Sequence, residues 1–176
     1  QTMFLPLLFL MTAITMGYSI VIFESLFASV GLKRPMETSL LAKISGIIPW
    51  LLALFLALRF GDIIVRGQFG LIFSFNLASI MFLIETAMFV FPMVVLFRAS
   101  NRYDERKLFV ASLVMVLAGA LYRFDTFIVV FNPGHGYHYF PALQEIMITV
   151  GIIAMEIMGY LWFVKRFPVL PEVKHA

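Results

Sequence analysis

Seven charged side chains stand inside long apolar segments of this sequence, where ionisable groups are unusual. In chain order they are Glu24, Lys43, Glu85, Arg123, Asp125, Glu145 and Glu156. A charged group at membrane depth is costly, so each one marks a functional-site hypothesis by default. Carboxyl groups in such surroundings can hold and pass protons, and a buried arginine must meet a carboxylate, a cavity or a ligand oxygen. We therefore expect part of this set to serve proton transfer.

The spacing of the acidic residues suggests a path for protons. Glu145 and Glu156 are eleven residues apart, which is nearly three helical turns, so they project from the same side of one helix. Their separation along the axis is about 16 Å, so a relay between them needs water or another side chain. Glu85, on a different segment, can be that intermediate. We predict a path through Glu145, Glu156, Glu85 and Glu24.

Some of these charges have an alternative interpretation as ion pairs that fix helix packing. Glu24 and Lys43 are expected at similar depth on either side of a short connection. Arg59 and Asp62 are three residues apart and can pair locally at a membrane interface. For both pairs the sequence favours this structural interpretation over a catalytic one.

The remaining buried charges leave both interpretations open. Arg123 and Asp125 are two residues apart and face away from each other, so each needs a partner elsewhere. Glu145 is the expected partner of Arg123. No basic residue is visible at the depth of Glu85 or Glu156, so these two can be neutral carboxyls, water-lined groups or packing residues.

Composition identifies the elements that must position these groups. Of the 176 residues, 62% are hydrophobic and 13% are charged, too few for the surface of a soluble domain. A membrane-spanning helix needs about 20 mostly apolar residues. Five segments satisfy this, approximately 3–26, 40–58, 70–97, 108–131 and 141–164. The runs are continuous and do not alternate with period two, which indicates helices rather than barrel strands. The sequence predicts an all-α transmembrane bundle that forms a single domain over 1–176.

The basic residues outside these segments predict the orientation of the bundle. Nine lie on one side, namely Lys33, Arg34, Arg98, Arg102, Arg106, Lys107, Lys165, Arg166 and Lys174. Only Arg59 and Arg66 lie on the other side. Basic loops favour the cytoplasm, so the C-terminus is expected there.

The absence of redox ligands limits the chemistry that this chain can perform alone. It contains no cysteine, and its three histidines, His135, His138 and His175, fall in loops or the tail. We therefore expect no haem and no iron–sulfur cluster in this chain, and no metal site. The first residue is Gln1, which suggests that this is the second half of a longer protein.

Several short strings resemble one known family of membrane subunits. They are Ile22-Phe23-Glu24-Ser25, Leu58-Arg59-Phe60-Gly61-Asp62, Tyr122-Arg123-Phe124-Asp125, Asn132-Pro133-Gly134, Tyr139-Phe140-Pro141 and Phe167-Pro168-Val169-Leu170-Pro171. Together they resemble the C-terminal half of NrfD-like, polysulfide-reductase-type subunits. The closest branch is the membrane subunit of periplasmic nickel–iron hydrogenases, often called cytochrome b although it carries no haem.

The resemblance implies a function that composition cannot supply. It implies a subunit of eight to ten helices in the cytoplasmic membrane of a bacterium or archaeon. Such a subunit passes electrons between menaquinone or ubiquinone and a periplasmic, ferredoxin-like iron–sulfur subunit. The catalytic centre then belongs to a partner, which can be a hydrogenase, a molybdoenzyme or a multihaem cytochrome. On the quinone side the candidate residues are Arg123 and Asp125.

Two other classes of function compete with this interpretation. A proton- or ion-coupled secondary transporter would favour internal repeats and helices broken at mid-membrane, and no convincing repeat is visible. A purely structural membrane anchor would tolerate neutral replacements of all its buried carboxyls.

Overall fold

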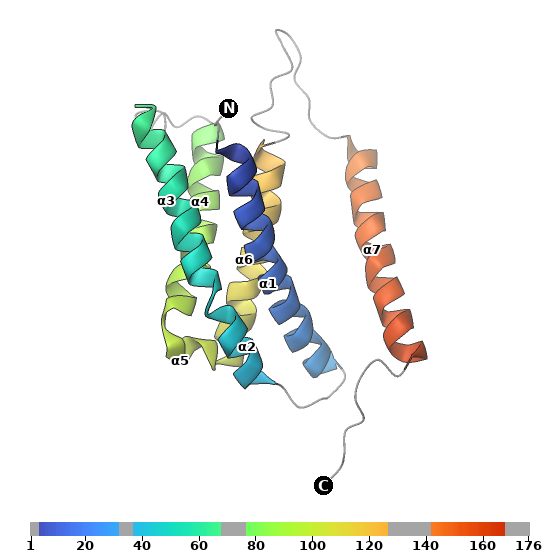
Figure 1. Cartoon of the computed structure of the whole chain (residues 1–176). Helices are drawn as coiled ribbons and strands as arrows, with labels where there is room; N and C mark the ends of the chain where they lie inside the picture. Colours follow the sequence, from blue (N-terminus) through green and yellow to red (C-terminus); the bar gives the residue numbers. More distant parts are fainter. Residues whose placement is uncertain (1–3, 32–36, 68–76, 127–141, 168–176) are drawn as a thin grey trace. The chain divides into compact units, whose positions relative to one another are not determined.

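The computed structural model describes residues 4–31, 37–67, 77–126 and 142–167 (Figure 1). These residues form helices and contain no strand, which confirms the predicted all-α class. The helices are α1 (Leu5–Gly31), α2 (Thr38–Ser45), α3 (Ile48–Val65), α4 (Leu77–Phe97), α5 (Ala99–Arg102), α6 (Glu105–Phe124) and α7 (Leu143–Arg166). Within the described ranges, five stretches are long and apolar enough to cross a membrane, with α2 and α3 together making one of them.

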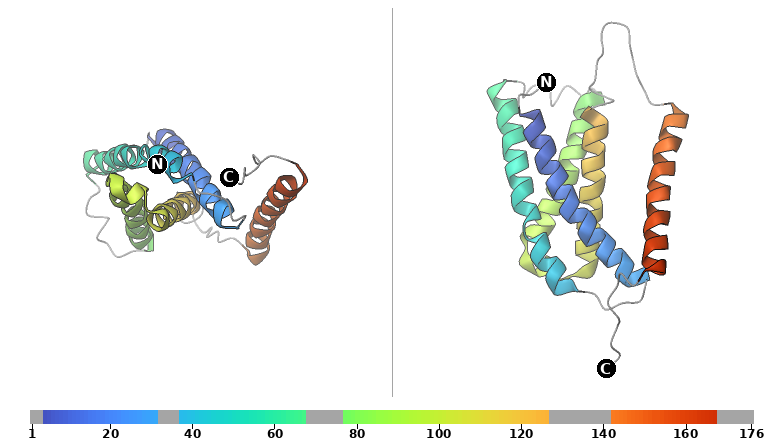
Figure 2. Two further views of the ribbon diagram at one scale, coloured as in Figure 1. Left: turned by 90° about the horizontal axis from the view of Figure 1, so that it is seen from below. Right: turned by 45° about the vertical axis from the view of Figure 1, so that its right-hand side comes forward.

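The described residues fall into two compact units, 1–130 and 131–176, and each is considered by itself. The first unit is a bundle in which α6 packs against α1 and α4, while α3 packs against the same two helices. Figure 2 shows α1 running obliquely across this group. The second unit contributes α7. A single bundle over 1–176 stays a prediction.

The core of the first unit is apolar and lies between the four long helices. Its fully buried members include Ile22, Leu52, Phe89, Leu108 and Met115. Large hydrophobic side chains also cover the outside, among them Trp50 and Leu54, which are 65% and 53% exposed. Such an outer surface matches a bundle whose solvent is lipid rather than water.

The second predicted segment is broken into two helices instead of being continuous. α2 ends at Ser45, and two tight backbone bonds follow, from the Gly46 N–H to the Lys43 carbonyl and from the Ile47 N–H to the Ile44 carbonyl. Pro49 then occupies the first turn of α3, where its missing N–H would have no helical partner in any case. The proline therefore starts a new helix rather than bending an existing one.

The ends of the observed helices differ from the predicted segments for identifiable reasons. α6 begins at Glu105, earlier than the predicted 108, because the Asp104 carboxylate accepts hydrogen bonds from the N–H groups of Arg106 and Lys107. α3 continues to Val65, seven residues beyond the predicted end at 58. Both extensions contain polar residues, which lower the hydropathy although they are helical. Hydropathy alone therefore makes both predicted segments too short. Residues 3, 70–76, 127–131 and 141 of the predicted segments lie outside the described residues.

Candidate functional site

The most unusual feature of the bundle is an ion pair in its apolar interior. The Arg59 guanidinium of α3 donates from Nη1 to Oε1 of Glu85 on α4. The Glu85 side chain is 0% exposed and that of Arg59 is 11% exposed. Taking two charges out of water costs several kcal/mol per ion, so the pair requires close mutual contact and further polar partners.

Aromatic rings surround the guanidinium of this pair. The Arg59 Cζ atom lies 4.4 Å from the ring centroid of Phe82, 5.3 Å from that of Tyr122 and 5.8 Å from that of Phe55. The negative face of an aromatic ring attracts a cation, most strongly where water is excluded. Arginine suits this place because its planar guanidinium is weakly hydrated and stays charged. The rings thus help to hold a charge that lipid or apolar packing would reject.

A second carboxyl group, Asp125, completes the cluster at the end of α6. The residue is 7% exposed, and its charge interacts with those of Arg59 and Glu85. Three buried side-chain oxygens of the described residues have no hydrogen-bond partner, namely Glu85 Oε2, Thr86 Oγ1 and Asp125 Oδ1. Glu85 therefore pairs with the guanidinium, Asp125 forms no ion pair with it, and each carboxyl retains an unused oxygen. Such an arrangement favours binding a proton or a polar ligand, because two buried carboxylates cannot both ionise cheaply beside one cation.

The helical period explains why these residues meet. On α3, Phe55 and Arg59 are four residues apart, and on α4 Phe82 precedes Glu85 by three. On α6, Tyr122, whose ring makes edge-to-face contacts with those of Phe55 and Phe89, precedes Asp125 by three. Residues three or four apart share one helix face. Each helix thus supplies an aromatic ring and a charged group to the same region, and we call Arg59, Glu85, Tyr122 and Asp125 the Arg59 cluster.

Two of the predicted pairings in this region are wrong. Arg59 was expected to pair with Asp62, but its partner is Glu85. Asp62 instead accepts from Nε of Arg66, at 3.1 Å, one turn further along α3. Glu85 was expected to have no basic partner, and it has one because Arg59 lies within the bundle rather than in a loop.

Arg123 lies beside the cluster but takes different partners. Its Nη1 donates to the Gly119 carbonyl at 3.1 Å and lies 3.2 Å from Sδ of Met16 on α1. The expected pairing with Glu145 is untested, because Glu145 belongs to α7 in the other unit.

The remaining candidates lie away from the cluster or in the second unit. Glu24 and Lys43 are both exposed, and the predicted ion pair between them is not formed. The ring of Phe9 lies 5.0 Å from that of Tyr122, which places the cluster near the start of α1. Glu24 is fifteen residues further along this helix. That is about 22 Å along the axis, too far for direct proton exchange with the cluster. Glu145 and Glu156 both lie on α7.

Sequence reasoning missed Arg59 and Tyr122 as members of the site. Arg59 was counted as a loop residue because it follows the hydropathy maximum of its segment. The available signal was the repeated spacing of an aromatic residue and a charged residue three or four positions apart on three segments. Each occurrence is common by itself, and only their meeting in the bundle makes them a site.

Comparison with known proteins gives one match. No family model matches the chain, and no solved structure matches it significantly. The chain is 44% identical over 172 residues to a protein of Escherichia coli (strain K12) described as a "probable Ni/Fe-hydrogenase 2 b-type cytochrome subunit". The alignment covers 97% of this chain but 44% of the relative, so the chain spans less than half of that protein's length.

This relative corrects the expectation that the chain carries no haem. A b-type cytochrome subunit is by its description a haem protein, which contradicts the expectation of no haem. The described residues include no histidine, so the helices described here do not fit a histidine-ligated haem. The three histidines of the chain, His135, His138 and His175, lie outside the described residues.

Proposed function

We propose that this chain is part of the membrane subunit of a hydrogenase complex, where it links the enzyme to the quinone pool of the membrane. The observation that carries the proposal is the 44% identity to a hydrogenase 2 b-type cytochrome subunit along almost the whole chain. The membrane-length helices support it, because a subunit between a hydrogenase and a lipid-soluble carrier must lie in the bilayer.

The electron partners belong to the same proposal. A periplasmic, ferredoxin-like iron–sulfur subunit delivers electrons from the catalytic subunit, and menaquinone or ubiquinone accepts them. The NrfD-like resemblance supports this arrangement, and so does the basic excess on one side of the predicted topology. In this orientation the C-terminus is cytoplasmic and the Arg59 cluster lies toward the periplasmic half of the membrane.

The Arg59 cluster has the chemistry to serve the proton side of quinone reduction. Reducing one quinone to quinol consumes two electrons and two protons, and apolar surroundings supply no protons themselves. Glu85 and Asp125 each retain a buried oxygen without a partner among the described residues. One of them can hold a proton while Arg59 neutralises the other. We assign to this pair the exchange of protons with the quinone side, with Arg123 orienting a carboxylate or quinone oxygen nearby.

The other predicted carboxyls are further members of the proposed proton path. About 22 Å of helix α1 separate Glu24 from Phe9, whose ring lies beside that of Tyr122 in the cluster. A proton that passes between Glu24 and the cluster therefore needs intermediate groups. Glu145 and Glu156 supply carboxyls along α7 for the same path.

Neutral replacement of Glu85 tests the proposal in the complete hydrogenase complex in its membrane. Glu85→Gln keeps the shape of the side chain and a hydrogen bond to Arg59 but can no longer release a proton. We expect hydrogen-dependent quinone reduction to fall by about 100-fold or more. Hydrogen-dependent reduction of a soluble dye, which bypasses the membrane subunit, should stay unchanged.

Asp62→Asn is the matched control, because it also neutralises a carboxylate that pairs with an arginine on the same bundle. Its quinone reduction should remain near that of the wild type. If Glu85→Gln and Glu156→Gln both reduce quinone and take up the protons for its reduction at wild-type rates, the proton role is wrong. If removal of the whole chain leaves hydrogen-dependent quinone reduction intact, the link to the quinone pool is wrong as well.

A further inference from the structure

The end of the bundle opposite the Arg59 cluster carries a pocket that the proposed function does not use. It lies where α4, α5 and α6 meet and has a volume of about 500 Å³. Phe91, Val95 and Val110 form its apolar part, while Arg98, Arg106 and Lys107 stand at its polar part. Because α4 and α6 are both membrane-length helices, the turn between them lies at a membrane boundary. The pocket thus combines apolar walls with cationic groups at that boundary.

The cations of this pocket differ in how far the protein itself uses them. Lys107 pairs with the Asp104 carboxylate at 3.2 Å and donates to Asn101 Oδ1 at 3.3 Å. The side chains of Arg98 and Arg106 are exposed and make no hydrogen bond or ion pair with any described residue. Two guanidinium groups are therefore available to an anion from outside the chain.

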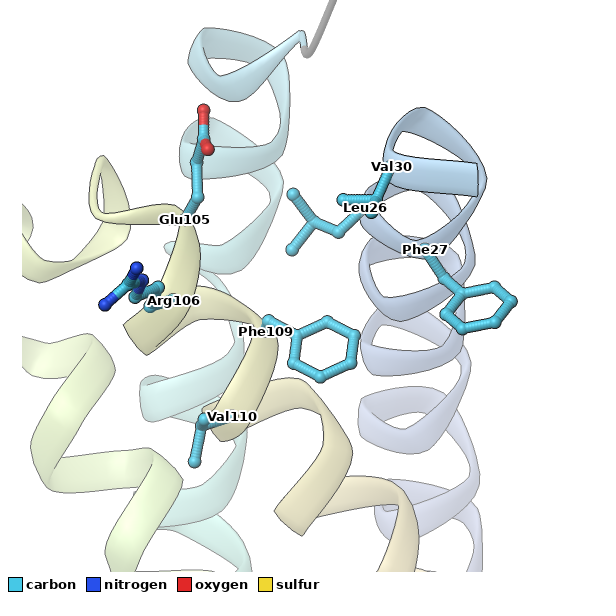
Figure 3. A pocket seen from close by; sticks show the side chains of 7 residues that line it. All are labelled: Leu26, Phe27, Val30, Glu105, Arg106, Phe109 and Val110. Carbon is cyan, nitrogen blue, oxygen red and sulfur yellow. The ribbon is translucent and has the colours of Figure 1, made fainter. Parts of the chain in front are cut away.

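A second apolar groove lies on the other side of α6 and shares two of these residues. Leu26, Phe27 and Val30 of α1 line it together with Phe109 of α6 (Figure 3), and Arg106 and Val110 line both grooves. Its volume is also about 500 Å³. The one acidic group there, Glu105, accepts a hydrogen bond at 3.2 Å from Thr38 on α2. In Figure 3 its carboxylate and the Arg106 guanidinium point in different directions.

We propose that this end of the bundle binds an anionic phospholipid, with the phosphate between Arg98 and Arg106 and the acyl chains in the grooves beside Val110. Guanidinium groups bind phosphate oxygens in a fork geometry, and basic pockets between membrane helices suit anionic headgroups. A zwitterionic lipid brings its own cation and gains less from the two arginines. A free phosphate leaves the apolar grooves without an occupant.

Lipid retention by the purified protein, together with the subunits that accompany it, tests this site. The delipidated protein is incubated with phosphatidylglycerol or with phosphatidylcholine of the same chains, and bound lipids are counted by native mass spectrometry. The wild type should prefer phosphatidylglycerol. In the double variant Arg98→Gln/Arg106→Gln the affinity for phosphatidylglycerol should fall by about 10- to 30-fold, toward that for phosphatidylcholine.

Two further variants separate this site from general charge effects and from misfolding. Arg66→Gln removes one exposed positive charge at the other end of α3 and should leave retention unchanged. Val110→Trp keeps both arginines but fills the grooves on a residue that is 43% exposed, and it should weaken phosphatidylglycerol binding. The helical circular dichroism of each variant checks its fold.

Three results would overturn the proposal. Equal retention of the two lipids by the wild type would remove the preference for an anion. Wild-type retention of phosphatidylglycerol by the double arginine variant would remove the assigned residues. Displacement of the lipid by an equal concentration of glycerol phosphate would show that the phosphate alone is the ligand and that the grooves contribute nothing.

Discussion

The two ends of the α1–α6 bundle use arginine in opposite ways. At one end the Arg59 side chain is 11% exposed, pairs with a fully buried carboxylate and lies among three aromatic rings. At the other end Arg98 and Arg106 are exposed and without partners among the described residues. A buried charge needs partners inside the protein because its removal from water is costly. A charge at the membrane boundary can instead pair with lipid headgroups or water.

Arg102 is an intermediate case at the exposed end. Its Nε donates to the Leu96 carbonyl at 2.6 Å, which satisfies a carbonyl in the last turn of α4. Its Nη1 would lie 2.9 Å from a Cβ atom added at Gly46, so the glycine at the break between α2 and α3 makes room for it. This arginine binds the backbone at the end of α4 and stabilises the turn between α4 and α6.

Removing the buried arginine should have the largest effect. Arg59→Met leaves Glu85 and Asp125 in the interior with no cation between them. We expect a loss of about 3–5 kcal/mol in the free energy of unfolding, as for other buried pairs that lose one partner. Titration of mixed micelles with sodium dodecyl sulfate, followed by circular dichroism, measures this quantity.

The double variant Arg59→Met/Glu85→Gln sharpens this test. Removing the second charge of the pair should restore part of the lost stability, because the uncompensated carboxylate is the source of the cost. If the two substitutions simply add, the pair is not the electrostatic centre of this end, and the contrast with the exposed end fails.

Replacing Arg102 should have a smaller effect at the opposite end. Arg102→Gln breaks a hydrogen bond between a charged donor and a backbone carbonyl, and we expect a loss of about 1.5–3 kcal/mol. The same unfolding titration measures it. Arg66→Gln, which removes an ion pair at the end of α3 whose arginine side chain is 33% exposed, is the comparison and should cost about 1 kcal/mol or less. Equal losses in the two variants would show that the turn needs no arginine.

The smallest expected effect is on how the stability contributed by the Asp104 cap, at the exposed end, changes with pH. Hydrogen bonds from the Lys107 backbone N–H and side chain hold the pKa of Asp104 below its ordinary value, with a further one from the Arg106 N–H. Because the pKa of Asp104 is lowered in the folded state, the ionised cap stabilises the protein at pH values above the ordinary pKa of an aspartate. This stability is lost as the pH falls through the lowered pKa. Asp104→Asn keeps a cap without the charge. Its melting temperature should therefore depend less on pH below about 4 than that of the wild type, as thermal scans at several pH values would show. If the melting temperatures of the two proteins fall in parallel as the pH is lowered, this role of Asp104 is contradicted.

From the sequence, two of the buried carboxyls could be found, but the partners of the charges could not. Glu85 and Asp125 were identified because charges in apolar segments stand out in one dimension. Arg59 was assigned to a local pair with Asp62, since neighbours on one helix are the only partners that spacing can reveal. Its true partner is 26 positions away on α4. No local pattern encodes that distance.

The class of this protein and the set of charged residues within its apolar segments can be read from the sequence. Hydropathy and length are additive along the chain, so five apolar segments and their helical state follow without tertiary information. Only the packed bundle shows which charges meet, where α2 ends and α3 begins, and which arginines have no partner among the described residues. The physical reason is that ion pairing and burial depend on distances between helices, which arise when the bundle packs and which no single segment contains.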